Sequence, residues 1–248
     1  MKQKTAVICL SRVNGGMELA SVKLARLLSQ DLEVEFIARN DSYIINRKEH
    51  FENCNVKVHI VEFSSNFSFK LIVKIRKILK ENNIKNVIFL GASEMKSIYF
   101  ATLGLDINFI IRQGSKKTTS KKDIFHKLLY KNVNYFVGNC EYMRKNIINI
   151  LPIPKNATVT RIYSSLKLQE NVNFKALNNT IDLVHVGRIN KGKGQFEVIK
   201  ACEILKENNV PFTIKFLGDI QDKNYFETMK NYLENSSLKN HVEFIGYT

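Results

Sequence analysis

The hydrophobic pattern repeats one arrangement near each end of the chain. Near the N-terminus, an apolar run at residues 5–10 leads into a loop that ends in two glycines. Apolar residues then recur at the spacing of one helix face through residues 17–29, and a second apolar run follows at 34–38. Residues 181–217 repeat this order of apolar run, glycine-containing loop, helix-period segment and apolar run. The pattern predicts two similar α/β domains.

The middle of the chain continues the alternation of strand and helix signals. Helical segments separate most of the apolar runs, which favours parallel sheets. The clearest helix prediction covers residues 68–81. The further strand predictions are residues 56–61, 87–90, 109–111, 135–137 and 158–162. A polar, asparagine-rich stretch then divides the chain into a first domain at 1–165, a linker at 166–180 and a second domain at 181–248.

Composition and charge narrow the classes of protein. Apolar residues make up 44% of the 248 residues, which is typical of a globular chain, and no apolar stretch reaches the roughly 18 residues of a membrane-spanning helix. The N-terminus does not resemble a signal peptide, so we expect a cytoplasmic protein. The four cysteines and five histidines show no metal-ligand spacing. The net charge of +15 favours a phosphate-bearing or membrane partner, because no nucleic-acid-binding motif is visible.

The loop after residues 181–186 is the strongest candidate site. Gly187, Arg188, Lys193 and Gly194 follow that buried strand and precede a helix. Ligands of open parallel sheets bind at the carboxyl ends of the strands, and helix N-termini favour anions. The loop therefore predicts a phosphate site, against the alternative of an ordinary solvated basic loop.

The same segment carries a resemblance to a known family. It shows the order G-R-hydrophobic, a three-residue spacer, K-G, a helix with a small residue and a leucine, and then V-x-F-x-G. These positions are Gly187, Arg188, Ile189, Lys193, Gly194, Ala201, Leu205, Val242, Phe244 and Gly246. In this set the chain resembles the donor domain of GT-B fold glycosyltransferases of family 4.

The resemblance implies two Rossmann-like domains, an acceptor-side domain and a nucleotide-sugar donor domain, facing each other across a cleft. It implies retaining, metal-independent transfer of a hexose to a glycan or lipid-linked acceptor in surface polysaccharide or lipooligosaccharide biosynthesis. The chain contains no D-x-D motif of the kind that holds a metal in GT-A enzymes. Arg188 and Lys193 are therefore the predicted catalytic residues, which stabilise the departing diphosphate in place of a metal. No cofactor is expected.

Further candidate residues lie in the first domain. Gly15 and Gly16, with Glu18, match a G-G-x-E form that the family places beside acceptor and donor phosphates. The two glycines are predicted to bind the donor and Glu18 to lie on the acceptor side, against the alternative of a plain turn before a helix. Arg112 and Gln113 follow the strand at 109–111, where the family often has a histidine or arginine, and are acceptor-side candidates. Residues 91–94 are a weaker candidate for the same region.

Two basic amphipathic stretches raise the possibility of a membrane surface as partner. One is the predicted helix at 68–81, for which a core-facing stripe is the favoured interpretation. The other runs from Lys116 to Lys131 and combines six lysines with apolar residues. An anionic inner leaflet of the plasma membrane and a solvated outer face remain alternatives for this second stretch.

Part of the family pattern is missing after residue 180. The three strand predictions there are fewer than a complete donor domain of that family has, and no glutamate is followed by another eight residues later. We therefore expect a C-terminally truncated second domain. A nucleotide-sugar 2-epimerase of the same fold and an inactive fragment that binds a membrane or partner are the alternative functions.

Overall fold

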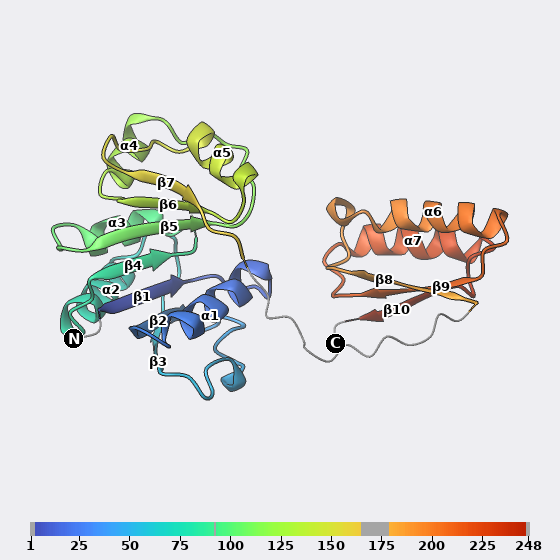
Figure 1. The fold of residues 1–248 in the computed structure, drawn as a ribbon, viewed down its shortest axis with the longest axis horizontal. Helices are drawn as coiled ribbons and strands as arrows, with labels where there is room; N and C mark the ends of the chain where they lie inside the picture. Colours follow the sequence, from blue (N-terminus) through green and yellow to red (C-terminus); the bar gives the residue numbers. More distant parts are fainter. Residues whose placement is uncertain (1–2, 92, 165–178, 247–248) are drawn as a thin grey trace. The chain divides into compact units, whose positions relative to one another are not determined.

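The computed structural model describes residues 3–91, 93–164 and 179–246, which belong to two compact units, Met1–Lys167 and Leu168–Thr248 (Figure 1). Of the predicted linker, only residues 179 and 180 lie within the described residues. Each unit contains a parallel sheet with helices, so the predicted α/β class with parallel sheets is confirmed.

The first unit contains a seven-stranded sheet in the order β3-β2-β1-β4-β5-β6-β7, and all its neighbouring strands are parallel. Its strands are β1 (Lys4–Cys9), β2 (Glu33–Arg39), β3 (Val56–Val61), β4 (Asn86–Phe89), β5 (Asn108–Gln113), β6 (Tyr135–Gly138) and β7 (Thr158–Arg161). Its helices are α1 (Gly16–Leu28), α2 (Phe69–Glu81), α3 (Met95–Thr102), α4 (Ile124–Tyr130) and α5 (Glu141–Ile150), with a short 3₁₀ turn at Lys48–His50.

Strand β1 shows why the strands of this unit appear in the sequence as uninterrupted apolar runs. Successive side chains of a strand point to opposite faces, and both faces of this sheet are covered. Val7 and Cys9 pack with Val22 and Ala25 of α1 in one core cluster. Ala6 and Ile8 pack in a second cluster, with apolar residues of the other four helices. A parallel strand buried in this way tolerates no alternation of polar residues.

The order of the strands predicts where the first unit binds a ligand. Strands β2 and β3 lie on one side of β1, and the chain then crosses to β4 on its other side. The two connections leave the carboxyl edge in opposite directions, which opens a crevice between the ends of β1 and β4. Ligands of doubly wound folds bind at such a switch point.

The second unit contains a three-stranded parallel sheet in the order β10-β9-β8. Its elements are β8 (Ile181–Val186), a 3₁₀ turn at Lys191–Lys193, α6 (Gln195–Glu207), β9 (Phe212–Leu217), α7 (Lys223–Glu234) and β10 (Val242–Gly246). Figure 1 shows α6 and α7 on the same face of this sheet. Phe212, Ile214 and Phe216 of the central strand pack on that face with Ile199 and Met229 of the helices.

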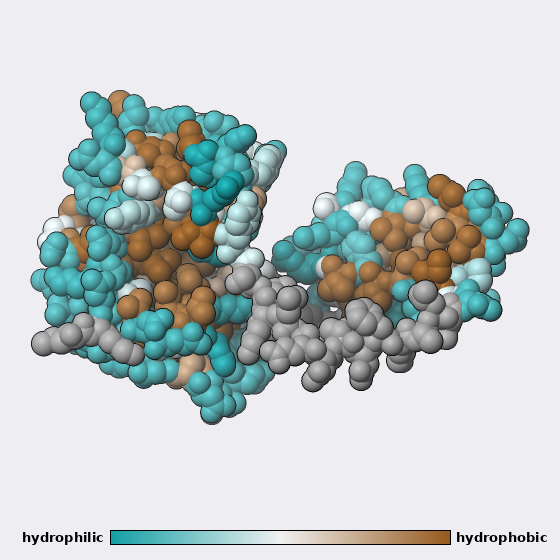
Figure 2. Space-filling model, viewed as in Figure 1, coloured by the Kyte–Doolittle hydropathy of each residue, from teal (hydrophilic) through white to brown (hydrophobic). Residues whose placement is uncertain are grey.

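The opposite face of the second sheet is exposed. Val184 and Val186 on β8 are 60% and 77% exposed, because alternate residues of that strand point away from the helices. Figure 2 shows hydrophobic residues on the viewed side of each unit, bordered by hydrophilic ones. A parallel sheet usually has helices on both faces, whereas the described part of this unit leaves one face uncovered, on which these valines lie beside polar groups such as the Lys215–Glu243 ion pair.

The basic stretch from Lys116 to Lys131 differs from a single amphipathic segment. Only its second part is helical, because Asp123 caps α4 by accepting a hydrogen bond from the backbone N–H of His126 at 3.1 Å. The first part is an extended loop after β5. Lys117 and Lys121 in this loop line a pocket, whereas Ile124, Phe125 and Leu128 of α4 are exposed and Leu129 is buried.

Candidate functional site

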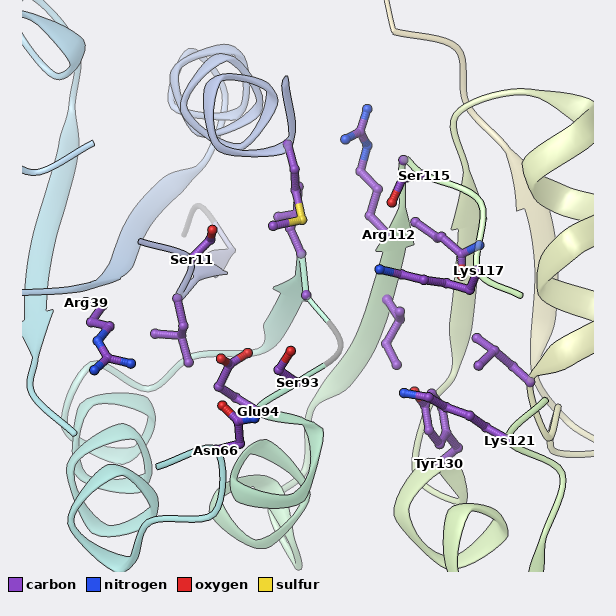
Figure 3. Close-up of a pocket in the computed structure, with 18 of the residues that line it drawn as sticks. Ser11, Arg39, Asn66, Ser93, Glu94, Arg112, Ser115, Lys117, Lys121 and Tyr130 are labelled. Carbon is purple, nitrogen blue, oxygen red and sulfur yellow. The ribbon is translucent and has the colours of Figure 1, made fainter. Parts of the chain in front are cut away.

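A pocket of about 410 Å³ opens at the carboxyl edge of the first sheet (Figure 3). Its walls come from the ends of β1, β2, β4 and β5 and from the loops that follow β1, β3, β4 and β5, which is where the switch point between β1 and β4 predicts a ligand. Its polar lining residues are Ser11, Arg12, Arg39, Ser64, Asn66, Ser93, Glu94, Arg112, Gln113, Ser115, Lys117, Lys121 and Tyr130. Five cationic side chains and one carboxylate make it a predominantly positive cavity.

Arg112 lies at the end of β5 and is partly buried. Its Nη2 donates to the Ser164 hydroxyl at 2.8 Å. No carboxylate lies within ion-pair distance of Arg112 among the described residues. Burial lowers the pKa of its guanidinium from the usual value, although the group remains charged at neutral pH. Arg112 therefore presents positive charge to the pocket.

The loop after β5 is held by two asparagines. Asn146 of α5 accepts through Oδ1 from Gln113 Nε2 at 2.7 Å and from the backbone N–H of Lys117 at 3.0 Å. Its Nδ2 donates to the Lys117 carbonyl at 2.9 Å. Asn139 Nδ2 donates to the Gly114 carbonyl at 3.2 Å. These bonds fix the backbone that carries Lys117, and they commit the Gln113 amide nitrogen to holding the loop.

The cations on the other side of the pocket are partly neutralised by a carboxylate. Arg39 lies within ion-pair distance of Asp41 at 2.6 Å, donates to the Phe63 carbonyl and lies over the Phe63 ring. Arg12 forms an ion pair with the same Asp41 at 2.9 Å. Glu94, at the N-terminus of α3, has its pKa raised by burial, and Arg39 lowers it by a smaller amount. Cations on this side therefore share a carboxylate that neutralises them in part.

The structure brings some of the predicted residues of the first unit together and separates others. Arg112, Gln113 and the weaker candidates Gly91, Ser93 and Glu94 all line the pocket, whereas Ala92 lies outside the described residues. Gly15 and Gly16 precede and begin α1 and are not lining residues, although the next residue, Met17, is one. The roles assigned to these residues stay predictions.

The packing around Gly15 gives a second reason for a glycine at this position. Glu18 is 3% exposed and folds back over the start of α1, so that a Cβ at Gly15 would lie 2.8 Å from its carboxylate oxygen. A carboxylate at this position is favoured by the free N–H groups of the first helical turn. Gly16 has open space around it. The structure therefore gives Gly15 a packing role beside the predicted ligand-binding one.

Several lining residues were not singled out from the sequence. Ser11, Arg12 and Arg39 lie at or just after the ends of β1 and β2, a position that the carboxyl-edge rule would have flagged. Lys117 and Lys121 were noticed only as part of a basic stretch. Tyr130 reaches the pocket from α4, and burial raises the pKa of its hydroxyl to about 12. It therefore remains a neutral hydrogen-bonding group.

The predicted phosphate loop lies at the carboxyl edge of the second sheet. The loop carrying Arg188 follows β8, and Lys193 ends the 3₁₀ turn immediately before α6. Gly194 caps that helix in the left-handed conformation, with φ of +75°. Neither Arg188 nor Lys193 has a carboxylate within ion-pair distance among the described residues of this unit. The loop thus places two uncompensated cations beside a helix N-terminus, as an anion site requires.

Hydrogen bonds hold this loop in place from both sides. The Gln195 side chain donates to the Arg188 carbonyl at 3.0 Å, and His185 Nε2 donates to the Lys193 carbonyl at 3.1 Å. The backbone N–H groups of Gly187 and Ile189 donate to the carbonyls of Leu217, at the end of β9, and Asp219, each at 2.8 Å. The backbone that presents Arg188 and Lys193 is therefore fixed, while their side chains remain accessible.

Gly218 makes this arrangement possible. Its φ is +145°, and a Cβ there would lie 2.3 Å from the carbonyl oxygen of Gly187. Its own N–H donates to the Gly246 carbonyl at 2.7 Å. The carboxyl ends of β8, β9 and β10 therefore meet through two glycine-mediated backbone contacts.

Comparisons with known proteins agree with this fold. Residues 167–248 match the family model described as glycosyl transferases group 1. A crystal structure of a glycosyltransferase from Rickettsia africae is similar over 100% of this chain and 69% of its own length, with a TM-score of 0.81 and 16% identity. The structure of HepE from Anabaena with UDP and glucose is similar over 99% of this chain and 70% of its own, with a TM-score of 0.73 and 15% identity.

A weaker likeness concerns the alternative function. A putative UDP-N-acetylglucosamine 2-epimerase from Listeria monocytogenes is similar over 100% of this chain and 70% of its own length, with a TM-score of 0.60 and 11% identity. No curated protein sequence matches the chain. The chain thus has the fold of the GT-B glycosyltransferases, and the match of residues 167–248 to glycosyl transferases group 1 supports a glycosyltransferase.

Proposed function

We propose that the protein is a retaining, metal-independent glycosyltransferase of the family 4 type, which moves a hexose from a nucleotide-sugar to a hydroxyl group of a surface-glycan precursor. The observation that carries the proposal is the pair of uncompensated cations, Arg188 and Lys193, at the carboxyl end of β8 and the N-terminus of α6. The group 1 match covers this segment. The hexose, the retaining course and the glycan acceptor follow from family resemblance.

The chemistry needs positive charge at the leaving group. When the bond between the sugar and the diphosphate breaks, negative charge builds up on the diphosphate. Arg188 and Lys193 stabilise that charge in the transition state, and the free N–H groups at the start of α6 add partial positive charge. The Phe196 N–H is not among them, because it donates to the Tyr225 hydroxyl at 2.9 Å. The proposal requires no metal ion for this step.

In this proposal, the first unit binds the acceptor. Gly15 and Gly16 contribute backbone N–H groups near the donor phosphates, while Glu18, Arg112 and Gln113 belong to the acceptor side. The supporting observation is that Arg112 and Gln113 line the pocket at the switch point of the first sheet. Because Gln113 Nε2 donates to Asn146, the side-chain oxygen Oε1 is the atom of this amide that can accept a hydrogen bond from an acceptor hydroxyl.

Release of free nucleotide from a panel of nucleotide-sugars tests this function. We expect one donor to release nucleoside diphosphate and to pass its sugar to an added glycan or lipid-linked acceptor, with the anomeric configuration kept. The Arg188→Ala/Lys193→Ala variant controls for contaminating hydrolases. Conversion of the sugar to its 2-epimer without an acceptor would instead favour the epimerase. A folded chain that releases no nucleotide from any donor would favour the inactive fragment and contradict the proposal.

A membrane-facing surface on α4 extends the proposal to the location of the acceptor. Ile124, Phe125 and Leu128 are 85%, 48% and 45% exposed on this short helix. Lys122, Lys127 and Lys131 surround them, and Lys96 of α3 lies 5.2 Å from the Phe125 ring. No helix among the described residues is long and apolar enough to cross a bilayer. We propose that this surface binds peripherally to an anionic leaflet.

Flotation with lipid vesicles checks the membrane surface. We expect binding to vesicles that contain anionic lipid and little binding to neutral ones, since each lysine near the surface contributes about 1 kcal/mol. Ile124→Glu/Leu128→Glu should abolish most of the bound fraction, because it places carboxylates where apolar side chains enter the headgroup region. Val73→Glu, at an exposed apolar position of α2, is the matched control. Equal flotation with neutral and anionic lipid would refute the surface.

A further inference from the structure

One side of the first unit's pocket concentrates cations that nothing in the described structure neutralises. Arg112, Lys117 and Lys121 all line it. Figure 3 shows them, with Ser115, on the side opposite Arg39 and Glu94. None of the three has a carboxylate within ion-pair distance among the described residues, in contrast to Arg12 and Arg39, which share Asp41. The two sides of the cavity therefore differ in how much charge remains free.

The positions of these unpaired cations disfavour the charged states of Lys121 and Arg112. Burial lowers the pKa of Lys121, and the neighbouring charge of Lys117 lowers it further. Arg112 is also partly buried without a counterion. Each of these effects disfavours the charged state, and a bound anion would reverse them. Clusters of like charge in a cavity that the fold does not neutralise are typical of sites that bind the opposite charge.

The backbone holds the cluster in this position. Lys117 is fixed through both its N–H and its carbonyl by Asn146, and the Lys121 N–H donates to the Ile150 carbonyl at 2.8 Å. Arg112 is held at its tip by Ser164. The three cations thus come from one strand end and one anchored loop, so little ordering is required when a ligand binds.

The floor next to the cations is apolar. Ile111, Ile150 and Leu151 line the pocket beside Tyr130, whose hydroxyl stays neutral. The volume of about 410 Å³ lies within the usual range for small-molecule pockets. The cavity therefore suits a molecule with one anionic group and a less polar part attached to it.

We propose that Arg112, Lys117 and Lys121 form a subsite for a phosphate group carried by the acceptor, so that the acceptor is a phosphorylated alcohol. This inference rests on the proposed glycosyltransferase function for the word acceptor, whereas the phosphate subsite itself stands on the pocket alone. The Ser115 hydroxyl is a further hydrogen-bond donor on the same side. Arg112 provides the forked guanidinium and the two lysines provide point charges, a combination suited to phosphate.

Calorimetric titration of the full chain with inorganic phosphate, at constant ionic strength, tests the subsite. It is done in the Arg188→Ala/Lys193→Ala background, which removes the second unit's loop as a competing site. Adding Lys117→Ala/Lys121→Ala should weaken phosphate binding ten-fold or more. The charge-matched control is Lys74→Ala/Lys80→Ala, at exposed positions of α2. Equal phosphate affinity in both variants, with unchanged circular dichroism, would overturn the subsite.

Titrations with two further ligands distinguish a lipid phosphate from a sugar phosphate. Tighter binding of dihexanoyl phosphatidic acid than of glucose 6-phosphate indicates a lipid headgroup, and the reverse order indicates a sugar phosphate. Both results support the subsite provided that the affinity depends on Lys117 and Lys121.

A nucleotide titration separates this inference from the proposed function. Lys117→Ala/Lys121→Ala in the otherwise unchanged chain should leave nucleoside diphosphate affinity within about two-fold. A large loss there would overturn the assignment to the acceptor and give the subsite to the donor. If no donor releases its nucleotide while phosphate binding still depends on these lysines, the glycosyltransferase proposal fails and the phosphate subsite stands.

Discussion

Replacing Arg188 or Lys193 with alanine is expected to weaken nucleoside diphosphate binding by ten-fold or more in each case. A charge-assisted hydrogen bond to a phosphate contributes about 1.5–3 kcal/mol, and about 1.4 kcal/mol corresponds to a factor of ten. Neither residue has a competing carboxylate among the described residues of its unit, so its charge is available to the ligand. Isothermal calorimetry with the nucleotide that the donor panel identifies measures both affinities.

Lys191→Ala is the matched control for this experiment. Lys191 lies in the same loop and is exposed, but it begins the 3₁₀ turn, three residues before the helix cap Gly194. We expect its loss to change the affinity by less than about three-fold, which is the long-range contribution of one exposed charge. An equal loss for Lys191, Lys193 and Arg188 would show general attraction by a basic surface. Unchanged affinity in folded Arg188→Ala and Lys193→Ala variants would remove the phosphate site.

Gly218→Ala is expected to destabilise the second unit by about 3 kcal/mol or more. The residue has φ of +145°, a region that side chains rarely adopt, and the new Cβ would lie 2.3 Å from the Gly187 carbonyl oxygen. That oxygen belongs to the backbone of β8's end, so it cannot move without displacing the loop that carries Arg188. The substitution should therefore lower nucleotide affinity as well as the midpoint of urea unfolding of this unit.

Gly192→Ala tests whether the effect is specific to that close approach. Gly192 lies in the phosphate loop, its φ is not in the left-handed region, and a Cβ there would meet only the Asn190 side chain at 3.4 Å. Its N–H, which donates to Asn190 Oδ1 at 3.0 Å, is retained in alanine. We expect a change in unfolding free energy below about 1 kcal/mol. Similar losses at both glycines would mean that the backbone contact at Gly218 is not what holds the loop.

The parallel sheets were predictable because their strands are buried on both faces or beneath helices. Residues 6–9 form an unbroken apolar run since each successive side chain enters one of two cores. The first and last residues of the helices and strands were less predictable. The helix predicted at 68–81 begins at Phe69, because Ser68 is its N-cap and accepts from the Leu71 N–H at 3.3 Å. The loop with Arg188 and Lys193 was identifiable because its chemistry is contained in consecutive residues.

The cationic pocket of the first unit was less accessible to sequence reasoning. Lys117 and Lys121 looked like part of a basic amphipathic stretch, and nothing local indicates that Asn146, almost 30 residues later, fixes their loop. Arg12 and Arg39 appeared as unrelated residues, yet they share Asp41 at one wall of the pocket. Ion pairing between distant segments decides which cations remain free, and spacing along the chain carries no information on it.

The α/β class, the parallel strands, the glycine-rich basic loop after β8 and the position of Arg112 at a strand end could all be inferred before the chain was folded. Each of these follows from periodicity or from neighbours along the chain. In contrast, the three-dimensional contacts were needed to show that Gly218 must be a glycine, that Gln113 is tied to Asn146, and that Arg112, Lys117 and Lys121 share one wall of a cavity. Such facts depend on the strand order, which brings the carboxyl ends of separate strands to one edge and lets loops far apart in sequence meet there.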